Sequence, residues 1–257
     1  MFFNSDKLKA FIYYALDPVV RGLKEYPALA SYEIINEPEG VVKIASDSEP
    51  CFDTMRVLNN SGAGWAGAKV SMEQMLKFIN WQAAIIHDID PKALVTVGSW
   101  ATYASTDVVM EEGREFFNYY KDECLIKAGA IANGTLDYNQ VHNYWTKPGQ
   151  PFQSSASDYA LGKPLVIGEF SSKKSSATKS ISLEYEYALG HGYSGVWDWA
   201  FKGGDGNDDL SIAVEGMAAL KGNNLVKVDI LNGSRPAEDT CGKVCSDEAP
   251  DGNYTCV

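Results

Sequence analysis

The sequence has 257 residues, of which 45% are hydrophobic and 22% charged, a composition that indicates a globular chain and excludes extended disorder. Its formal net charge of −12 makes nucleic acid an unfavourable partner, because phosphate binding depends on clustered lysine and arginine. No run of about 18 apolar residues is present, so we predict no membrane span.

Helical spacing of apolar residues predicts a long first helix over residues 5–25, with a kink at Pro18. Another helix is predicted over 71–88, where Ser71 and Gln74 can form a capping box. Further helical segments are predicted at 107–129 (with interruptions), 155–162, 178–191 and 212–221.

Short apolar runs between these helices predict five strands, near residues 32–35, 94–98, 139–144, 165–168 and 195–199. Strands that alternate with helices form a parallel sheet covered by helices. Each run ends in polar or aromatic residues, and in β/α barrels the carboxyl ends of the strands carry the active site. We therefore expect one face of the molecule to hold the chemistry.

Two glutamates end strands of this set, Glu37 after the first and Glu169 after the fourth. Glycoside cleavage needs one carboxylic acid to protonate the leaving oxygen and a second carboxylate as nucleophile or base. A lone glutamate after an apolar run is more often a helix cap or an ion-pair partner. The contexts Asn-Glu-Pro and Gly-Glu-Phe favour the catalytic interpretation here. We interpret the nearby Glu33 as a structural charge and Glu39 as a loop residue.

An ordered set of motifs carries a resemblance to a known family. The segments 34–38 (IINEP), 142–144 (HNY) and 166–170 (VIGEF), followed by Trp197, resemble the signature of glycoside hydrolase family 5, which consists of retaining β/α-barrel glycosidases. The surrounding text is similar to that of the animal-type endo-β-1,4-mannanases over about residues 5–232. The matching segments are NEPEG at 36–40, PCFDT at 50–54, GAGWAG at 62–67, FINWQAA at 78–84, DPKALVTVGSW at 90–100, KPLVIGEFSS at 163–172 and HGYSGVWDW at 191–199.

The resemblance implies a role for each matching residue. Glu37 is expected as the acid/base and Glu169 as the nucleophile. The other expected roles are contact with the sugar 2-hydroxyl region for Asn36, orientation of substrate for His142, a hydrogen bond to the nucleophile for Tyr144, the floor of the cleavage subsite for Trp197, and neighbouring subsites for Trp199, Trp100 and Trp145. A core position for His142 and for the Trp197–Trp199 pair remains an alternative.

The resemblance also implies an endo-β-1,4-mannanase that acts on plant or algal β-mannan as a monomer, without metal or cofactor. Two alternatives remain open: the same barrel acting on β-1,4-glucan, and an inactive sugar-binding fragment. The sequence 203–209 (GGDGNDD) contains several acidic residues, but its spacing fits no calcium template, so we predict a turn.

The family implies eight strands, whereas this sequence predicts five, with only about 30 residues before Glu37. We expect residues 1–235 to form a TIM (β/α)8 barrel that lacks its first three βα units. Three cysteines crowd residues 236–257, which resemble the start of a truncated Cys-rich carbohydrate-binding module.

Several features indicate an extracellular protein. The sequence has four Asn-X-Ser/Thr glycosylation sequons, at Asn59, Asn133, Asn232 and Asn253. The N-terminus does not read as a signal peptide, and we expect that leader to be absent together with the missing N-terminal units. Cys51 and Cys124 either pair as a disulfide or are two buried thiols, and the sequence leaves both possibilities open.

Overall fold

The computed structural model describes residues 1–144, 149–173, 180–200 and 209–223. Five strands lie in this part of the chain: β1 (Tyr32–Asn36), β2 (Val95–Gly98), β3 (Asn139–Asn143), β4 (Leu165–Phe170) and β5 (Gly195–Asp198). The α-helices are α1 (Ser5–Phe11), α2 (Asp17–Leu23), α3 (Met55–Leu58), α4 (Met72–Ile89), α5 (Asp122–Gly129), α6 (Ile181–Gly190) and α7 (Leu210–Ala218). The five predicted strands are thus confirmed, each within one or two residues of its predicted bounds.

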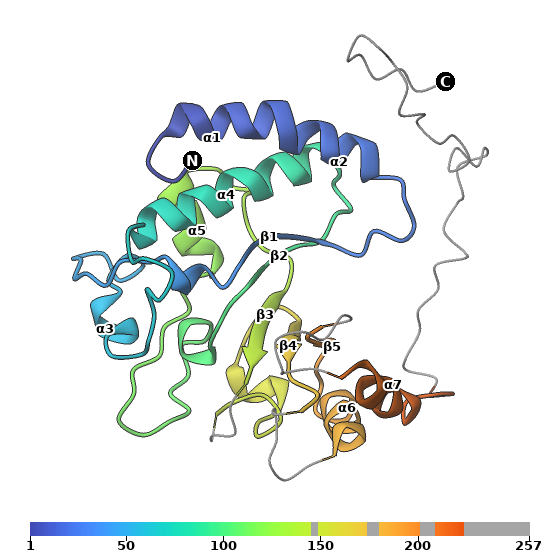
Figure 1. Cartoon of the computed structure of the whole chain (residues 1–257). Coiled ribbons are helices and arrows are strands. Elements are labelled where there is room, and N and C mark those ends of the chain that lie inside the picture. Colours follow the sequence, from blue (N-terminus) through green and yellow to red (C-terminus); the bar gives the residue numbers. More distant parts are fainter. Residues whose placement is uncertain (145–148, 174–179, 201–208, 224–257) are drawn as a thin grey trace, which may run out of the picture.

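The strands form two parallel sheets, β1-β2 and β3-β4-β5, in which each strand pairs with the next one in the chain (Figure 1). A parallel bridge between Ser99 and Val141 joins the sheets. Across the same junction the His142 N–H donates to the Ser99 carbonyl and the Asp137 N–H donates to the Val95 carbonyl. Sequential parallel order brings the carboxyl ends of all five strands to one edge. This confirms the predicted parallel α/β architecture.

The predicted first helix is one helical segment with a change of hydrogen bonding in its middle. Between α1 and α2, residues 12–16 form a π-helical turn, in which the N–H of Asp17 donates to the carbonyl of Ile12. Pro18 follows directly; it cannot donate to the carbonyl of Tyr14, and its ring crowds that group. The irregularity expected at Pro18 therefore takes the form of a wider turn just before it.

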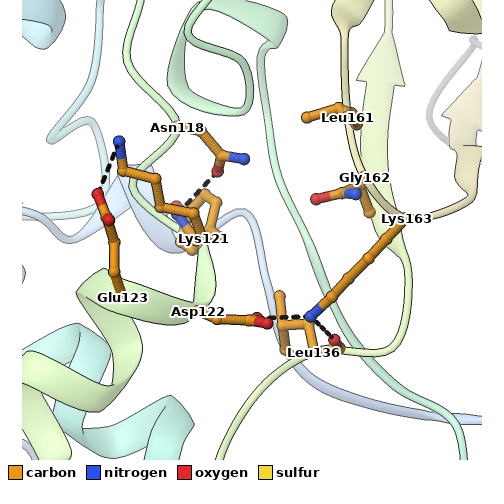
Figure 2. Close-up of a pocket in the computed structure, with 10 residues that line it drawn as sticks. Asn118, Lys121, Asp122, Glu123, Leu136, Leu161, Gly162 and Lys163 are labelled. Carbon is orange, nitrogen blue, oxygen red and sulfur yellow. Dashed lines mark hydrogen bonds and ion pairs between the residues drawn. The ribbon is translucent and has the colours of Figure 1, made fainter.

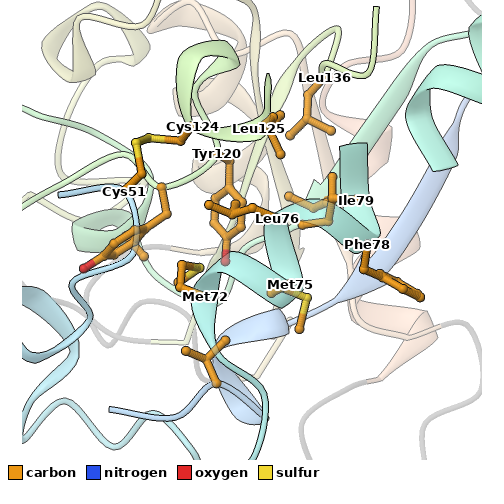
Figure 3. Close-up of a cluster of buried hydrophobic side chains, with 14 of the residues drawn as sticks. Cys51, Met72, Met75, Leu76, Phe78, Ile79, Tyr120, Cys124, Leu125 and Leu136 are labelled. Carbon is orange, nitrogen blue, oxygen red and sulfur yellow. A yellow bond between two sulfur atoms is a disulfide. The ribbon is translucent and has the colours of Figure 1, made fainter. Parts of the chain in front are cut away.

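Helix α4 is the centre of the larger hydrophobic core. It begins with the predicted capping box, in which Ser71 and Gln74 exchange side-chain and backbone hydrogen bonds. Its buried face packs against α5, β1 and the N-terminal helices, and Figure 3 shows Leu76 and Ile79 pointing into this cluster. Cys51 and Cys124 are joined by a disulfide at the edge of this core. Of the two possibilities that the sequence left open, a disulfide or two buried thiols, the structure thus has the disulfide.

A second, smaller core lies between the β3-β4-β5 sheet and α6. Its members include the fully buried Phe152, Ile167 and Phe170, and the ring of Phe170 meets that of Tyr185 on α6 edge to face. Helix α7 packs on α6 (Figure 1). Among the described residues, no helix combines the length and the apolarity needed to cross a membrane.

Two helix predictions were wrong in extent. The segment predicted at 155–162 contains only a 3-10 turn, Ala156–Tyr159. Of the predicted segment 107–129, only α5 is helical; the part before it is an irregular loop held by both backbone and side-chain hydrogen bonds. Asp107 accepts from the N–H of Asn118, and Asn118 in turn accepts from the N–H of Tyr120. The predicted turn at 203–208 and the Cys-rich tail at 236–257 lie outside the described residues.

Candidate active site

Residues from four of the five strand ends meet at one edge of the two sheets. Glu37 directly follows β1, His142 lies in β3 with Tyr144 just beyond it, Glu169 lies near the end of β4, and Trp197 lies in β5. All five were predicted as site residues. Parallel sheets bind their ligands at this edge, so the arrangement marks it as the candidate active site.

Glu37 occupies a backbone conformation that is unusual for a residue with a side chain. Its φ and ψ are 44° and 59°, in the left-handed region that costs about 1–3 kcal/mol for a non-glycine residue. Backbone hydrogen bonds hold it there: its N–H donates to the Gly98 carbonyl at 2.6 Å, and its carbonyl accepts from the Gly40 N–H at 2.9 Å. The turn directs the carboxylate of Glu37 toward His142.

The imidazole of His142 lies between the two carboxylates. Its Nδ1 shares a 2.9 Å hydrogen bond with Oε1 of Glu37 and lies 3.4 Å from Oε2 of Glu169. One oxygen from each carboxylate and one imidazole nitrogen all lie within 4.8 Å of one another. His142 is fully buried, as expected for the alternative in which it is a core residue. Its contacts with both carboxylates nevertheless place it in the candidate site.

Glu169 is more enclosed than Glu37. Burial raises the pKa of Glu169 above its ordinary value, although the nearby His142 and a hydrogen bond from Tyr144 act in the opposite direction. The Tyr144 hydroxyl donates to Oε2 of Glu169 at 2.7 Å. A donated hydrogen bond favours the charged carboxylate, so Tyr144 limits the effect of burial.

A cavity of about 410 Å³ opens beside Glu169. Its lining includes Asn36, Glu169, Trp197 and Trp199. The two tryptophan side chains are 47% and 42% exposed, which argues against the alternative that they belong to the core. Large exposed rings beside a polar pair offer flat apolar faces to a bound ligand.

Trp100 and Trp145 were predicted to line neighbouring positions. Trp100 follows β2 and is half-buried. The centre of its ring lies 4.6 Å from the centre of the Trp65 ring. Trp65 was not among the predicted site residues. Trp65 is 49% exposed and lies against Gly40, in the turn that follows Glu37. The GAGWAG segment of the resemblance contains Trp65 and was the available signal. Trp145 lies outside the described residues.

Glu39 is not the loop residue that the sequence suggested. Its side chain is fully buried and accepts hydrogen bonds from Ser99, Tyr120 and the backbone N–H of Trp100. Glu33, by contrast, is exposed at the cavity and accepts from Gln140 at 2.6 Å, in keeping with a structural charge. No local sequence feature distinguished Glu39, because its partners lie far along the chain.

The Glu37, His142 and Glu169 side chains also have the donor types of a divalent-cation site. The 2.9 Å hydrogen bond between Nδ1 of His142 and Oε1 of Glu37 places a proton between two of these atoms. An ion bound to both of these atoms would have to displace that proton.

A second cavity, of about 330 Å³, lies at the opposite ends of the strands. Figure 2 shows Lys163 reaching from the segment before β4 to Asp122 and to the backbone of Leu136. Lys121 and Glu123 pair on its other wall. The Lys163–Asp122 ion pair ties α5 to the sheet. The cavity lies at the edge where parallel sheets gain stability rather than chemistry.

The sequence was compared with those of known proteins. No family model matches the sequence. The chain is 43% identical over 231 residues to a mannan endo-1,4-beta-mannosidase of Cryptopygus antarcticus, covering 87% of this chain and 58% of that protein. It is 46% identical over 202 residues to one of Mytilus edulis, covering 77% of this chain and 53% of that protein.

The fold agrees with these relatives. The crystal structure of beta-1,4-D-mannanase from Cryptopygus antarcticus superposes with a TM-score of 0.80 at 42% identity, covering 90% of this chain and 62% of that one. The chain thus spans between half and two thirds of the length of the proteins it matches. Over the part of those proteins that it spans, this chain is similar in sequence and fold to animal beta-mannanases, in agreement with the resemblance that its motifs carry.

Proposed function

We propose that the protein hydrolyses internal β-1,4-mannosidic bonds of mannan, galactomannan or glucomannan, with retention at the anomeric carbon. The observation that carries the proposal is the approach of Glu37 and Glu169, whose nearest oxygens lie within 4.8 Å. Retaining glycosidases hold their two carboxyl groups about 5–5.5 Å apart, whereas inverting ones need about 6.5–9.5 Å to admit a water. The short approach supports direct attack by one carboxylate.

In the first step Glu37 gives a proton to the glycosidic oxygen, and an oxygen of Glu169 attacks the anomeric carbon from the opposite face of the sugar. The bond to the leaving chain breaks and a mannosyl ester of Glu169 forms. Glu37 is suited to proton transfer because its carboxylate lies at the mouth of the site, with 23% of the side chain exposed. Glu169 is the more enclosed group, on the nucleophile's side.

In the second step the Glu37 carboxylate takes a proton from water, and the water oxygen attacks the anomeric carbon. The ester bond breaks, Glu169 leaves as a carboxylate and Glu37 is again protonated, so two inversions give net retention. His142 contacts both carboxylates and keeps them aligned through this exchange of roles. Tyr144 stabilises the departing Glu169 carboxylate.

The walls of the cavity suit a neutral polysaccharide. Trp197 and Trp199 supply faces on which sugar rings stack, and Asn36 supplies an amide for a sugar hydroxyl. A net charge of −12 does not oppose an uncharged polymer. We propose plant or algal β-mannan as the substrate, a monomeric enzyme, and a sheet that belongs to a (β/α)8 barrel.

We propose further that the protein folds in the secretory pathway. A buried disulfide between Cys51 and Cys124 supports an oxidising compartment. The sequon residues Asn59 and Asn133 both have exposed side chains, as glycosylation requires. A shift in electrophoretic mobility after endoglycosidase treatment of the secreted protein is the expected result; an intracellular protein without glycans would contradict the proposal.

The decisive experiment compares galactomannan with carboxymethylcellulose and follows the product anomer by NMR. We expect cleavage of galactomannan with the β-anomer formed first, and loss of activity by a factor of about 10³ or more in Glu169→Ala. Glu184→Gln is the matched control, because Glu184 is a buried carboxylate on α6 away from the cavity. Faster cleavage of the cellulose derivative would identify a glucanase, and an active Glu169→Ala protein would disprove the mechanism.

A further inference from the structure

Glu39 lies two residues after Glu37, in the turn that follows β1. Its side chain is 0% exposed, so it cannot touch a polysaccharide. Its Oε1 accepts from the Ser99 hydroxyl at 2.8 Å and the Tyr120 hydroxyl at 2.7 Å, and its Oε2 accepts from the Trp100 N–H at 3.1 Å. Every donor belongs to another segment of the chain, after β2 or before α5.

A carboxylate in this position is expensive. No Lys, Arg or His side chain in the described part of the chain forms an ion pair with Glu39, and burial raises its pKa. Taking a charged or polar group out of water costs free energy that hydrogen bonds only partly restore. An apolar side chain would fill the space at lower cost, so stability alone does not account for a glutamate here.

The geometry shows what the carboxylate holds. Residues 38–40 form the tight turn that keeps Glu37 in its left-handed conformation. The backbone of Glu39 is fixed by a bond from the Gly64 N–H at 2.9 Å, and its side chain fixes the same turn to the end of β2. The strained residue and its anchor are thus neighbours in one turn.

We propose that Glu39 is a positioning residue for the acid/base Glu37: its buried carboxylate clamps the turn after β1 to the segment after β2, and so holds the Glu37 carboxyl where it can protonate the leaving oxygen. This inference rests on the proposed function of Glu37. It assigns Glu39 an effect on proton transfer rather than on sugar binding or nucleophilic attack.

The leaving group of the substrate separates this role from a general structural one. A sugar leaving group needs a proton from Glu37, whereas 2,4-dinitrophenolate leaves without one. Since kcat/KM reports the first step, Glu39→Ala should lower it by about 10²-fold for mannohexaose and by no more than roughly threefold for 2,4-dinitrophenyl β-mannobioside. For the aryl substrate, kcat and KM should fall together, because the same carboxylate also activates water in the second step.

A conservative variant tests whether the clamp depends on hydrogen bonds. In Glu39→Gln the amide oxygen can accept from the Trp100 N–H, while the Ser99 and Tyr120 hydroxyls rotate to accept from the amide nitrogen. Glu39→Gln should therefore recover most of the kcat/KM for mannohexaose that Glu39→Ala loses. Glu184→Ala provides the matched control for removal of a buried carboxylate, and it should affect the two substrates equally.

The outcomes are distinct. If Glu39→Ala lowers kcat/KM equally for the two substrates, Glu39 is a structural residue and the inference is wrong. If Glu37→Ala itself shows no dependence on the leaving group, the proposed function fails instead. Should Glu39→Ala not fold, as judged by near-UV circular dichroism, Ser99→Ala and Tyr120→Phe each remove one donor and must show the same selective loss; equal losses there would also overturn the inference.

Discussion

The Tyr144 hydroxyl lies 2.7 Å from Oε2 of Glu169 and donates a hydrogen bond to it, while burial raises the pKa of the same carboxyl. In the proposed mechanism Glu169 must be ionised to attack, so we expect activity to be lost as the pH falls through its pKa. Tyr144→Phe removes a hydrogen-bond donor that favours the charged form of Glu169. The acidic limb of the pH profile of kcat/KM should therefore move to higher pH. Tyr193→Phe, a buried tyrosine outside the site, should leave the limb in place; a limb at lower pH in Tyr144→Phe would contradict this account.

Gly98, the last residue of β2, is expected to tolerate no side chain. A Cβ there would lie 2.8 Å from Oδ1 of Asn36 and 3.0 Å from Nε2 of His142. His142 is fully buried and cannot move aside, so the site must distort. Displacements of about 1 Å at a catalytic group cost about 10²-fold in rate, and we expect a loss of that size in kcat/KM for Gly98→Ala. Gly22→Ala, where nothing lies within 4 Å, is the control; an unchanged rate in Gly98→Ala would show that the site is less tightly packed.

The disulfide is expected to govern stability and not catalysis. Cys51 and Cys124 are 73 residues apart, and closing a loop of that length lowers the entropy of the unfolded chain by an amount worth about 4 kcal/mol. The double variant Cys51→Ala with Cys124→Ala should lose stability of this order in urea unfolding, while kcat at low temperature is retained. Reduction of the wild-type protein should give the same shift, and an unchanged urea midpoint in either experiment would contradict the expectation.

Glu39 is also expected to make stability depend on pH. Burial raises its pKa, so between the ordinary glutamate value of 4.5 and the higher folded value the folded protein binds more protons than the unfolded chain. Its contribution to the free energy of unfolding is therefore fully present at low pH and declines as the pH rises through the folded pKa. Urea unfolding across this range should show the wild-type protein losing stability relative to Glu39→Gln; parallel curves would show that Glu39 has an ordinary pKa in the folded protein.

Most of the fold followed from local patterns. The apolar spacing and capping box of α4 and the five short strands appear where the sequence predicts them, because these signals act over neighbouring residues. The loop before α5 did not follow. Phe116, Tyr119 and Tyr120 have helical spacing, yet they are buried by distant contacts; Tyr119, for example, donates to the carbonyl of Asp53. Tertiary packing there overrides the local preference.

The same distinction applies to the site. Glu37, His142 and Glu169 could be predicted because each ends or follows a strand, and parallel strands bring such residues together. Glu39 could not, because its burial depends on Ser99 and Tyr120, which are 60 and 81 positions away. The contact between the Trp65 and Trp100 rings could not be predicted either, because the two residues lie in different loops.

The junction between the two sheets has a consequence for how the protein loses activity. Glu37 is carried by the β1-β2 sheet, whereas His142 and Glu169 are carried by β3-β4-β5. The sheets are joined by the bridge between Ser99 and Val141 and by a few hydrogen bonds beside it, fewer than a full strand pairing supplies. A slight opening of this junction separates the carboxylates while every helix and strand stays intact. Enzymatic rate is therefore the most sensitive reporter of the junction, and inactivation by mild heat or dilute urea should precede any change in the circular dichroism of the backbone.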